Sequence, residues 1–350
     1  MAVNSFWGNK NVLITGHTGF KGSWLALWLS EMGANVYGYA LEPDTNPSIF
    51  DQLKLKDRIN HSTGNICDFK NLKKYIDNIK IDFVFHLAAQ SLVLRGYKDT
   101  LNTWNTNVMG TANLLEALRR SNHACVVIAI TTDKVYKNNE TSYAFRENDH
   151  LGGIDPYSAS KSGTELVIDS YRSLFNQDNL PIRIASARAG NVIGGGDWCQ
   201  NRLLPDIIRA NINNIPIITR NPNAVRPWQH VLEPLSGYLH LAKKLKNSGK
   251  YASAYNFGPY SDDNRTVENV IQAALEIWPG IYHENINSSA PYESGILKLT
   301  IDKANTELGW YPKWRFITAI TKTIDWYQQV HNGANPIEIT LNQIKSYTAA

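Results

Sequence analysis

The sequence predicts an α/β protein with a Rossmann-type, doubly wound parallel sheet and a smaller, mixed α/β lobe. Two observations carry this prediction. Short apolar or β-branched runs alternate with segments of helical periodicity through the first half of the chain. The first of these runs also leads directly through a turn with three glycines into a helix-like segment. Strands separated by helices pair in parallel, because each return to the sheet passes through a crossover helix.

Six runs are expected to be strands of this sheet, at residues 12–15, 36–41, 83–88, 125–131, 182–187 and 254–257. Helical periodicity is found at residues 23–32, 69–78, 107–120, 158–175, 203–211 and 231–245. From residue 190 to 228 this alternation ends, and glycine, proline, asparagine and tryptophan become frequent. We therefore expect a Rossmann domain at residues 1–189, to which the chain returns at about 230–260, and a substrate-binding lobe at residues 190–229 and 261–350.

The composition is that of an ordinary globular protein. Hydrophobic residues make up 43% of the 350, and the net charge of +4 is spread along the chain, which does not favour nucleic-acid binding. Three widely spaced cysteines form neither a metal-binding nor a disulfide pattern. The N-terminus lacks the apolar core of a signal peptide, and the longest apolar stretch, residues 124–130, is too short for a membrane span. We expect a cytoplasmic protein without a metal.

The turn after the first strand has features of a dinucleotide site. It consists of Gly16, His17, Thr18, Gly19, Phe20, Lys21 and Gly22. Backbone N–H groups at such a turn can bind a pyrophosphate, although a plain strand-to-helix turn is the alternative. Glu42, near the end of the second strand, is only loosely placed for ribose hydroxyls. Because no arginine stands there to bind a 2′-phosphate, the pattern favours NAD over NADP.

Two further strand ends are of interest, because ligands gather at the carboxyl ends of strands in doubly wound sheets. One strand ends in a segment with two small alanines, which would let a cofactor ribose approach the backbone or would simply suit tight packing against a helix. These residues are Leu87, Ala88, Ala89 and Gln90. The next strand ends in a group of hydroxyl, carboxylate and ammonium side chains, for which a solvated loop is the alternative. They are Thr131, Thr132, Asp133 and Lys134.

Tyr157 and Lys161 are four residues apart on a predicted helix, so their side chains lie one turn apart on the same face. A lysine in that position can hold a tyrosine as phenolate, which turns a weak acid into a base. The spacing alone is common among helix-surface residues. Together with the glycine turn and the polar strand ends, it indicates redox or acid–base chemistry.

Where the lobe begins, arginines and tryptophans suggest a site for a phosphorylated ligand. Arg202, Arg220 and Arg226 can each bind phosphate in a bidentate way, and Trp228 offers a flat face for a sugar or base. A surface salt bridge is the alternative for each arginine taken alone. As a group they fit a diphosphate.

These motifs resemble the extended short-chain dehydrogenase/reductase superfamily. Within it, the Thr132-Asp133-Lys134 segment and residues 190–198 and 226–231 resemble the CDP-glucose branch of the nucleotide-sugar 4,6-dehydratases. The resemblance extends from Trp7 to about Trp314. It implies a lyase that uses NAD to oxidise CDP-glucose at carbon 4, eliminates water across carbons 5 and 6, and returns hydride to carbon 6.

The resemblance also implies roles for individual residues. Tyr157, with its pKa lowered by Lys161 and the nicotinamide charge, would take the proton of the 4-hydroxyl, and Thr132 would hydrogen-bond that hydroxyl. Asp133 would be the acid and Lys134 the base of the elimination. A free lysine has a pKa of about 10.4, so a base at this position needs burial or neighbouring positive charge. Stabilisation of the enolate by a charged Lys134 is the alternative.

The expected binding residues follow from the same resemblance. Besides the glycine turn, the NAD contacts are Asn65, Ile66, Leu87, Ala88, Ala89, Gln90, Thr131, Tyr157 and Lys161. The substrate contacts are Gln90, Ser91, Asn191, Arg202, Leu203, Arg220, Arg226, Trp228 and His230. Many relatives have an acidic residue where Asn65 stands, which weakens that assignment. Asn107, which matches the usual asparagine of the superfamily, is expected to shape its helix instead of touching substrate.

Relatives of this kind commonly pair through two long helices, here near residues 107–120 and 158–175, so a homodimer or homotetramer is expected. Their pathway is that of deoxysugars for bacterial surface polysaccharide, such as the O-antigen of lipopolysaccharide. Two other functions remain as alternatives: a nucleotide-sugar epimerase or reductase, and a dinucleotide-binding sensor without catalysis. The epimerase needs no acid–base pair for elimination, and the sensor has no need of Thr132, Tyr157 and Lys161 together.

Overall fold

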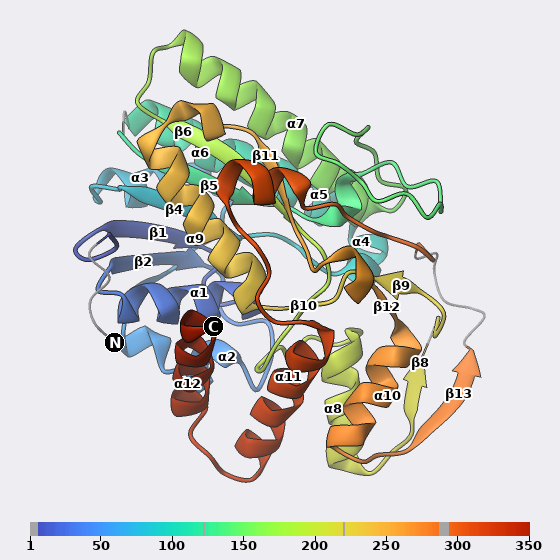
Figure 1. The fold of residues 1–350 in the computed structure, drawn as a ribbon. Helices are drawn as coiled ribbons and strands as arrows, with labels where there is room; N and C mark the ends of the chain where they lie inside the picture. Colours follow the sequence, from blue (N-terminus) through green and yellow to red (C-terminus); the bar gives the residue numbers. More distant parts are fainter. Residues whose placement is uncertain (1–5, 122, 220, 287–293) are drawn as a thin grey trace.

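The computed structural model describes residues 6–121, 123–219, 221–286 and 294–350. In this part of the chain, a parallel sheet of seven strands has the order β3-β2-β1-β4-β5-β6-β11 (Figure 1). The strands are β1 (Asn11–Thr15), β2 (Asn35–Ala40), β3 (Asn60–Thr63), β4 (Phe83–His86), β5 (Val126–Ile130), β6 (Arg183–Ala189) and β11 (Ala254–Phe257). The predicted Rossmann-type, doubly wound sheet is confirmed.

The six runs predicted as strands all form strands of this sheet, with ends that shift by at most two residues. Every residue of β4 and β5 is buried, as is usual for parallel strands covered on both faces. The sequence does not predict β3, because its four residues are polar. It lies at the edge of the sheet and pairs with only one strand, β2.

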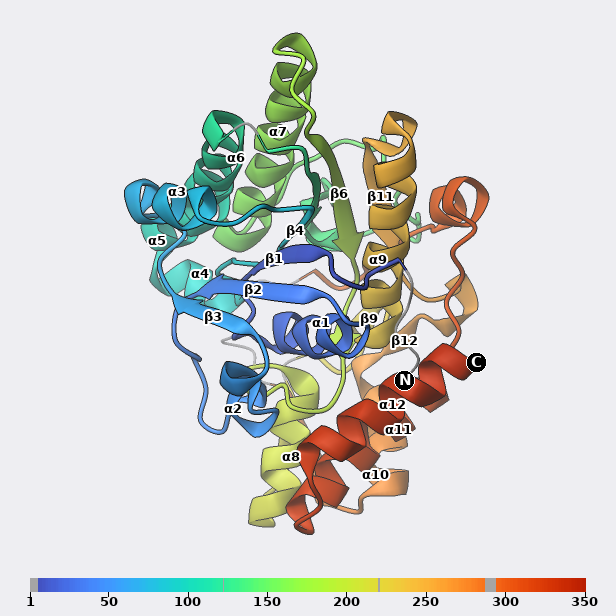
Figure 2. The same ribbon diagram turned by 90° about the vertical axis from the view of Figure 1, so that its left-hand side faces the viewer.

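Helices cover both faces of the sheet (Figure 2). One face carries α3 (Phe69–Asp77), α6 (Gly110–Ser121) and α7 (Pro156–Gln177). The other face carries α1 (Phe20–Glu31) and α9 (Leu232–Asn247). Two apolar cores result, one around Leu114 and Ile168 and a larger one around Trp24 and Leu235. All six predicted helical segments are helical, except that residues 107–109 belong to a π-helical turn, η2 (Asn105–Met109).

The remaining elements are short connections and the parts of the lobe. The connections are α2 (Ile49–Gln52), η1 (Leu55–Asp57), α4 (Val93–Lys98), α5 (Thr100–Trp104), η3 (Asp133–Val135), η4 (Gly249–Tyr251), η5 (Ser261–Asp263) and η6 (Ala304–Leu308). The lobe contains β7 (Val192–Ile193), α8 (Leu203–Asn213), β8 (Ile217–Thr219), β9 (Val225–Arg226), β10 (Gln229–His230), β12 (Arg265–Thr266), α10 (Val267–Ile277), β13 (Tyr282–Ile286), α11 (Phe316–His331) and α12 (Pro336–Ala349). Its strands form small pairs, β10 with β7, β12 with β9 and β13 with β8.

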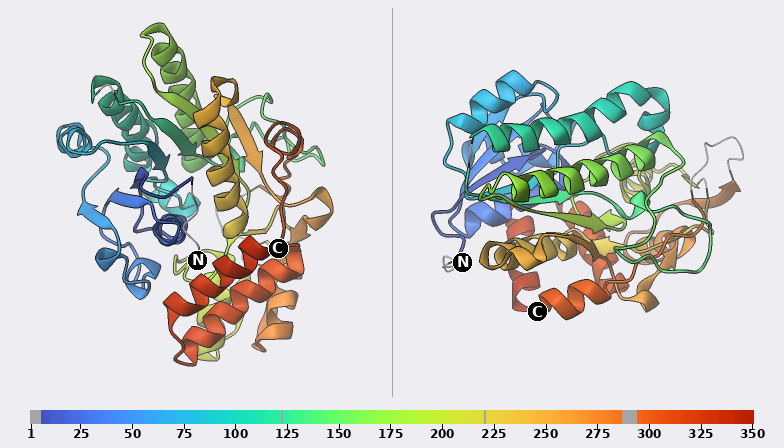
Figure 3. Two further views of the ribbon diagram at one scale, coloured as in Figure 1. Left: turned by 60° about the vertical axis from the view of Figure 1, so that its left-hand side comes forward. Right: turned by 90° about the horizontal axis from the view of Figure 1, so that it is seen from above.

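The chain leaves the sheet after β6, returns for α9 and β11, and then ends in the helices α11 and α12 (Figure 3). This path matches the predicted excursion and return, while the division into domains stays a prediction. In the described residues, no helix has both the length and the apolar character needed to cross a membrane.

Glu233 ties the C-terminal region to α9. Its side chain is fully buried and accepts hydrogen bonds from the backbone N–H groups of Lys313 and Trp314 and from the Tyr347 hydroxyl. Burial raises the pKa of Glu233 to about 7, although the Trp314 and Tyr347 donors act in the opposite direction. The attachment therefore combines a strong hydrogen-bond network with a carboxyl group that titrates near neutrality.

We expect ionisation of Glu233 to weaken the fold as the pH rises. The folded protein holds a proton that the unfolded chain, with a glutamate pKa of about 4.3, releases at lower pH. The free energy of unfolding should therefore fall between about pH 4 and pH 7, and the Glu233→Gln variant should lack this part of the decrease. Denaturant titrations of both proteins across that range measure the difference. Identical pH dependence would contradict the raised pKa.

Candidate active site

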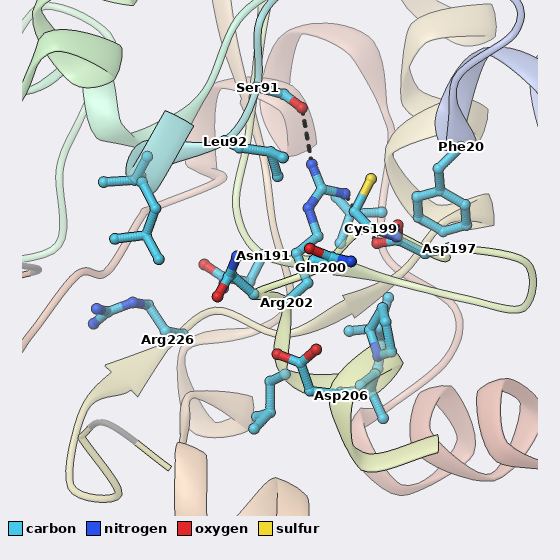
Figure 4. Close-up of a pocket in the computed structure, with 18 of the residues that line it drawn as sticks. Phe20, Ser91, Leu92, Asn191, Asp197, Cys199, Gln200, Arg202, Asp206 and Arg226 are labelled. Atoms are coloured by element: carbon cyan, nitrogen blue, oxygen red, sulfur yellow. Dashed lines mark hydrogen bonds and ion pairs between the residues drawn. The ribbon is translucent and has the colours of Figure 1, made fainter. Parts of the chain in front are cut away.

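A cavity of about 720 Å³ lies at the carboxyl ends of β1, β5 and β6, where the lobe meets the sheet. The sheet domain contributes the start of α1, the residues after β5 and the start of α7. The lobe contributes the segment before α8 and the residues around Arg226 (Figure 4). All strands of the sheet run in the same direction, so segments far apart in sequence meet at this one edge.

The glycine turn fits closely against the end of β4. Gly16 has a φ of +76°, and a Cβ there would lie 2.6 Å from the Ala88 nitrogen. A Cβ on Gly22 would lie 2.2 Å from the Gly16 oxygen, whereas one on Gly19 would meet nothing nearer than 3.5 Å. Gly19 is the N-cap residue of α1, so the first N–H groups of that helix are available to an anion. The turn therefore has the shape and the donors that a pyrophosphate requires.

The side chains of His17 and Thr18 make hydrogen bonds that hold this turn against neighbouring segments of the protein. The His17 ring is buried beside Gly38 of β2, and its Nε2 is 2.7 Å from His61 Nδ1. Burial, and then the neighbouring His61, lower the pKa of His17 to about 3. Thr18 Oγ1 donates to the Leu41 carbonyl. Any contact that these residues make with a cofactor is thus expected from their backbone.

The residues after β4 are also held by internal hydrogen bonds. The Leu87 and Ala88 N–H groups donate to the Thr15 carbonyl and hydroxyl, respectively. The Gln90 side chain donates to Thr103 Oγ1 and accepts from the Leu92 N–H, so its amide is engaged within the protein. Gln90 does not line the cavity. Its expected contact with substrate is not supported by this placement.

Asn107 links three elements beneath the site. Its side-chain Oδ1 accepts from the Gln90 N–H, and its Nδ2 donates to the Gln90 carbonyl and to Ser160 Oγ of α7. It is 1% exposed and does not line the cavity, which agrees with a structural role. The irregular turn η2 that contains it is therefore fixed to both β4 and α7.

Asn65 and Ile66 follow β3 at the same edge of the sheet. Asn65 Oδ1 accepts from the Cys67 N–H, and Ile66 is buried against Gly110. Glu42, at the end of β2, accepts from Thr63 Oγ1. The expected contact of this region with NAD stays a prediction.

Thr132, Asp133 and Lys134 all line the cavity. Thr132 Oγ1 donates to Asp133 Oδ1 at 3.0 Å, while Asp133 Oδ2 has no hydrogen-bond partner among the described residues. Burial raises the pKa of Asp133, although the charges of Lys134 and Arg226 oppose this shift. Asp133 is therefore suited to carry and donate a proton.

Tyr157 is placed by the start of α7. Asp155 caps this helix, because its carboxylate accepts from the Tyr157 and Ser158 N–H groups, and Pro156 occupies the first turn. The Tyr157 side chain lines the cavity. Burial raises its pKa to about 12, whereas the Thr132 hydrogen bond and the charge of Arg202 lower it. Burial thus outweighs the nearby donors and cations of the protein itself, and the expected lowering by Lys161 together with the nicotinamide charge stays a prediction.

Lys161 lies one turn after Tyr157 and is buried. Its ammonium donates to the Ile130 carbonyl at the end of β5. Burial lowers the pKa of Lys161 to about 8, and the carboxylate of Glu165 acts in the opposite direction. Thr131, which was expected at the cofactor, donates its hydroxyl to Glu165 Oε1 at 2.5 Å.

Arg202 joins the two halves of the site. It is the N-cap residue of α8, and its guanidinium donates to Asp197 Oδ2 and to Ser91 Oγ, as Figure 4 shows for Ser91. Asn191 and Leu203 line the cavity in the same region. The hydrogen bond from Arg202 to Ser91 thus connects the lobe to the segment after β4.

Arg226 and Trp228 form another part of the cavity lining. The Arg226 guanidinium donates to the carbonyls of Val225, Ser294 and Gly295. The Trp228 ring is buried, and its Nε1 donates to the Arg265 carbonyl. These contacts hold a cation and an aromatic ring at fixed positions in the lobe.

His230 does not line the cavity. Its ring is fully buried between Trp24 and Trp314, with ring centroids 5.8 and 4.9 Å away, and burial lowers its pKa to about 3. The assignment of His230 to the substrate is therefore not supported. Arg220, also expected at the substrate, lies outside the described residues.

Lys21 and Glu165 are the residues that sequence reasoning did not single out for their side chains. Lys21 lines the cavity, and burial, together with the charges of Lys161 and Arg202, lowers its pKa to about 7. Glu165 is fully buried four residues after Lys161. The spacing of four from Tyr157 to Lys161 and again to Glu165 was the available signal.

No cluster of three or more potential metal ligands is found in the described part of the chain. Fold and site together define an α/β protein of the extended short-chain dehydrogenase/reductase superfamily, with a glycine turn at β1 and a Tyr-Lys pair on α7.

Comparisons of sequence narrow this class further. A family model described as GDP-mannose 4,6 dehydratase matches residues 13–323, and the chain belongs to this family. A CDP-glucose 4,6-dehydratase of Salmonella typhimurium is 43% identical, over 100% of this chain and 99% of that protein. A dTDP-glucose 4,6-dehydratase of Haemophilus influenzae is 25% identical, over 91% of this chain and 97% of that protein.

Solved structures agree in fold. A dTDP-glucose 4,6-dehydratase of Bacillus anthracis in complex with NAD has a TM-score of 0.76 at 21% identity, over 94% of this chain and 99% of that chain. A UDP-glucose 4-epimerase of Thermotoga maritima with UDP-glucose has a TM-score of 0.78 at 19% identity, over 92% of this chain and 99% of that chain. Dehydratases and epimerases thus share this architecture, and the fold alone does not separate them.

Replacement of Gly22 by alanine is expected to destabilise the protein, since its Cβ would overlap the Gly16 oxygen. A methyl group forced into packed backbone typically costs about 1–3 kcal/mol. Gly19→Ala is the matched control, because its Cβ has room. Thermal unfolding of both variants tests the close fit of the turn. Equal stability of the two variants would contradict it.

Proposed function

We propose that this protein is a hydro-lyase that removes water from CDP-glucose and yields CDP-4-dehydro-6-deoxyglucose. The observation that carries the proposal is the 43% identity to a CDP-glucose 4,6-dehydratase over the whole chain. The cavity supports it, because Thr132, Asp133, Lys134 and Tyr157 all line one space. Oxidation at carbon 4 and elimination across carbons 5 and 6 require such acids and bases.

NAD is the proposed cofactor, and the glycine turn fits its pyrophosphate. The residues proposed to hold it are those of the turn, Asn65, Ile66, Leu87, Ala88, Ala89, Tyr157 and Lys161. When bound, NAD supplies the hydride acceptor for carbon 4, the hydride donor for carbon 6 and, in its oxidised form, a positive charge.

Tyr157 is the proposed base at the 4-hydroxyl. As a phenol with a pKa of about 12, it requires added positive charge to give up its proton at neutral pH. Arg202 supplies part of that charge, and Lys161, one turn away on α7, is the proposed second source. Thr132 would hydrogen-bond the same hydroxyl and hold its oxygen toward Tyr157.

The elimination is assigned to Asp133 and Lys134. Once carbon 4 is a ketone, the hydrogen on carbon 5 is acidic, and Lys134 in its neutral form would remove it as a proton. Asp133 would protonate the 6-hydroxyl, so that the carbon–oxygen bond breaks and water leaves. The raised pKa of Asp133 suits this role, because a carboxylic acid must still hold its proton near neutral pH to donate it.

The lobe would hold the nucleotide diphosphate. Arg202 and Arg226 are cations on the cavity wall, and Trp228 is an aromatic ring beside them. Ser91, Asn191 and Leu203 complete this part of the lining. Cytosine as the base rests on the identity to the CDP-glucose enzyme, since no contact in the cavity has a mechanism that selects it.

A homodimer or homotetramer is part of the proposal. Helices α6 and α7 are the expected contact, and the nearby elements α5, η2 and α7 expose large apolar side chains. These are Leu101, Trp104, Met109 and Leu166. A face of this kind is favourable to cover with a second copy. A cytoplasmic location, inferred from the cysteines, also stays a prediction.

Mass spectrometry after incubation with CDP-, UDP-, GDP- and dTDP-linked glucose, with and without added NAD, tests the function. We expect loss of water from CDP-glucose alone. Loss of water from another nucleotide sugar would overturn the assignment of the base. No loss from any of them, in a protein that carries nicotinamide, would favour an epimerase or reductase.

Lys134→Ala should separate oxidation from elimination. We expect this variant to retain some oxidation at carbon 4, seen as NADH absorbance, because Tyr157, Lys161 and Thr132 are intact. Exchange of the carbon-5 hydrogen with deuterium from solvent should be lost, because its base is missing. Exchange at the wild-type rate would assign the base to another residue. Tyr157→Phe is the control, since it should lose both signals.

A further inference from the structure

Glu165 continues the line of catalytic side chains into the core. Tyr157, Lys161 and Glu165 follow one another at intervals of four residues, so they lie on one face of α7. The Glu165 side chain has no exposed surface. A carboxylate in such a place is costly unless charges and hydrogen bonds compensate it.

Both oxygens of Glu165 are fully engaged. Arg188 of β6 binds them in a bidentate way, through Nε at 2.9 Å and Nη2 at 3.0 Å. Thr131 Oγ1 donates to Oε1 at 2.5 Å, and Ser186 Oγ donates to Oε2 at 2.7 Å. Four donors from β6 and the end of β5 thus hold Glu165 ionised, and its pKa is lowered despite burial.

One of these contacts leads directly to the active site. Thr131 immediately precedes Thr132, so its bond to Glu165 fixes the strand end that carries the acid and the base. Lys161 lies one turn before Glu165 on the same face of α7, and its ammonium donates to the carbonyl of Ile130, the residue before Thr131. The carboxylate of Glu165 is therefore bonded to the segment that carries the proposed acid and base, and it lies one helical turn from Lys161.

The other groups around Lys161 do not replace this negative charge. His86 of β4 is buried, with its pKa lowered to about 3, so it is neutral. Lys21 of α1 brings positive charge, and Tyr157 is a neutral phenol in this structure. Arg188 is itself paired with Glu165. Among these groups, Glu165 supplies the anion that favours a protonated Lys161.

We propose that Glu165 is a positioning residue that keeps Lys161 protonated and holds the strand end at Thr131 against α7. The effect of Glu165 on the protonation of Lys161 does not depend on the proposed function. Only its consequence for the reaction rests on that function. A buried ion pair with a purely structural role would fix α7 to β6 without any influence on the protonation of Lys161.

The test is the isosteric variant Glu165→Gln of the full-length protein. The side chain of Lys161 is titrated by NMR in protein with ¹³C-labelled lysine, and its signal is identified by its absence in Lys161→Arg. Loss of the neighbouring carboxylate should lower the titration midpoint of Lys161 by about one pH unit or more. An unchanged midpoint would overturn the proposal.

Asp169→Asn is the matched control. Asp169 lies one further turn along α7, is exposed and pairs with Arg172, so the change removes the same charge from the same helix. The midpoint of Lys161 should stay in place. A shift as large as that of Glu165→Gln would mean that any carboxylate on α7 has this effect, and would overturn the specific role.

Glu165→Gln leaves Arg188 buried without its anion and can therefore fail to fold. The double variant Glu165→Gln with Arg188→Met removes both charges. Because Glu165 is the neighbour that raises the pKa of Lys161, the midpoint should still fall in the double variant. A folded double variant with the wild-type midpoint would overturn the proposal.

Activity gives a second and separate readout. If the proposed function holds, the alkaline fall of kcat with CDP-glucose should move to lower pH by the same amount as the midpoint. If the midpoint of Lys161 falls but the protein dehydrates no nucleotide sugar, the proposed function is refuted. The effect of Glu165 on Lys161 is then still supported. A lower midpoint with an unmoved alkaline fall in an active enzyme would overturn the link to catalysis.

Discussion

The parallel direction of the central strands is the constraint on which the rest of the structure depends. Because β1, β4, β5 and β6 all point the same way, their carboxyl ends form one edge. In the sequence three segments are far apart, and each simply follows its own strand. These are the glycine turn, the loop after β4 and the Thr-Asp-Lys segment. The sheet brings them together, and the lobe adds Arg202 and Arg226 across the same cavity. An antiparallel partner would have carried one of these segments to the opposite edge.

Burial at this edge changes the acid–base character of its residues. It raises the pKa of Tyr157 and Asp133 and lowers that of Lys161 and Lys21, so each group is moved toward its neutral form. For Asp133 the shift supports the role of an acid. For Tyr157 and Lys161 it opposes the charged pair that oxidation needs. The buried carboxylate of Glu165, which is paired with Arg188, works against that penalty at Lys161.

Much of the fold follows from the sequence, because buried parallel strands are apolar runs and their helices have a clear period. The strand β3 does not follow, since an edge strand can be polar. The lobe strands β7, β9, β10 and β12 have two residues each, too few for a local pattern, and they form only through pairing with distant segments.

The same division holds for the site. The sequence predicts residues that a backbone conformation or a chemical role requires, such as Gly16 and Tyr157. His230 and Gln90 are polar residues inside or beside motifs, yet their side chains serve the core and a loop. No local pattern distinguishes that use from binding. Arg188 lies on strand β6 and Glu165 on helix α7, so their pairing becomes evident only in the three-dimensional structure.

The architecture shared with an epimerase at a TM-score of 0.78 means that the fold does not decide the reaction, which depends on the residues of the site. Epimerisation and dehydration both begin with oxidation at carbon 4, for which a tyrosine and a lysine suffice. Elimination adds a demand for an acid and a base. Under the proposed function that demand is met by η3, a turn of three residues shortly after β5, in which the Thr132 hydroxyl accepts from the Lys134 N–H. The strand fixes where this turn begins, and Thr131 fixes it to α7 through Glu165. The proposed acid and base therefore lie at a rigid strand end instead of on a long loop, which suits groups whose displacement would be costly.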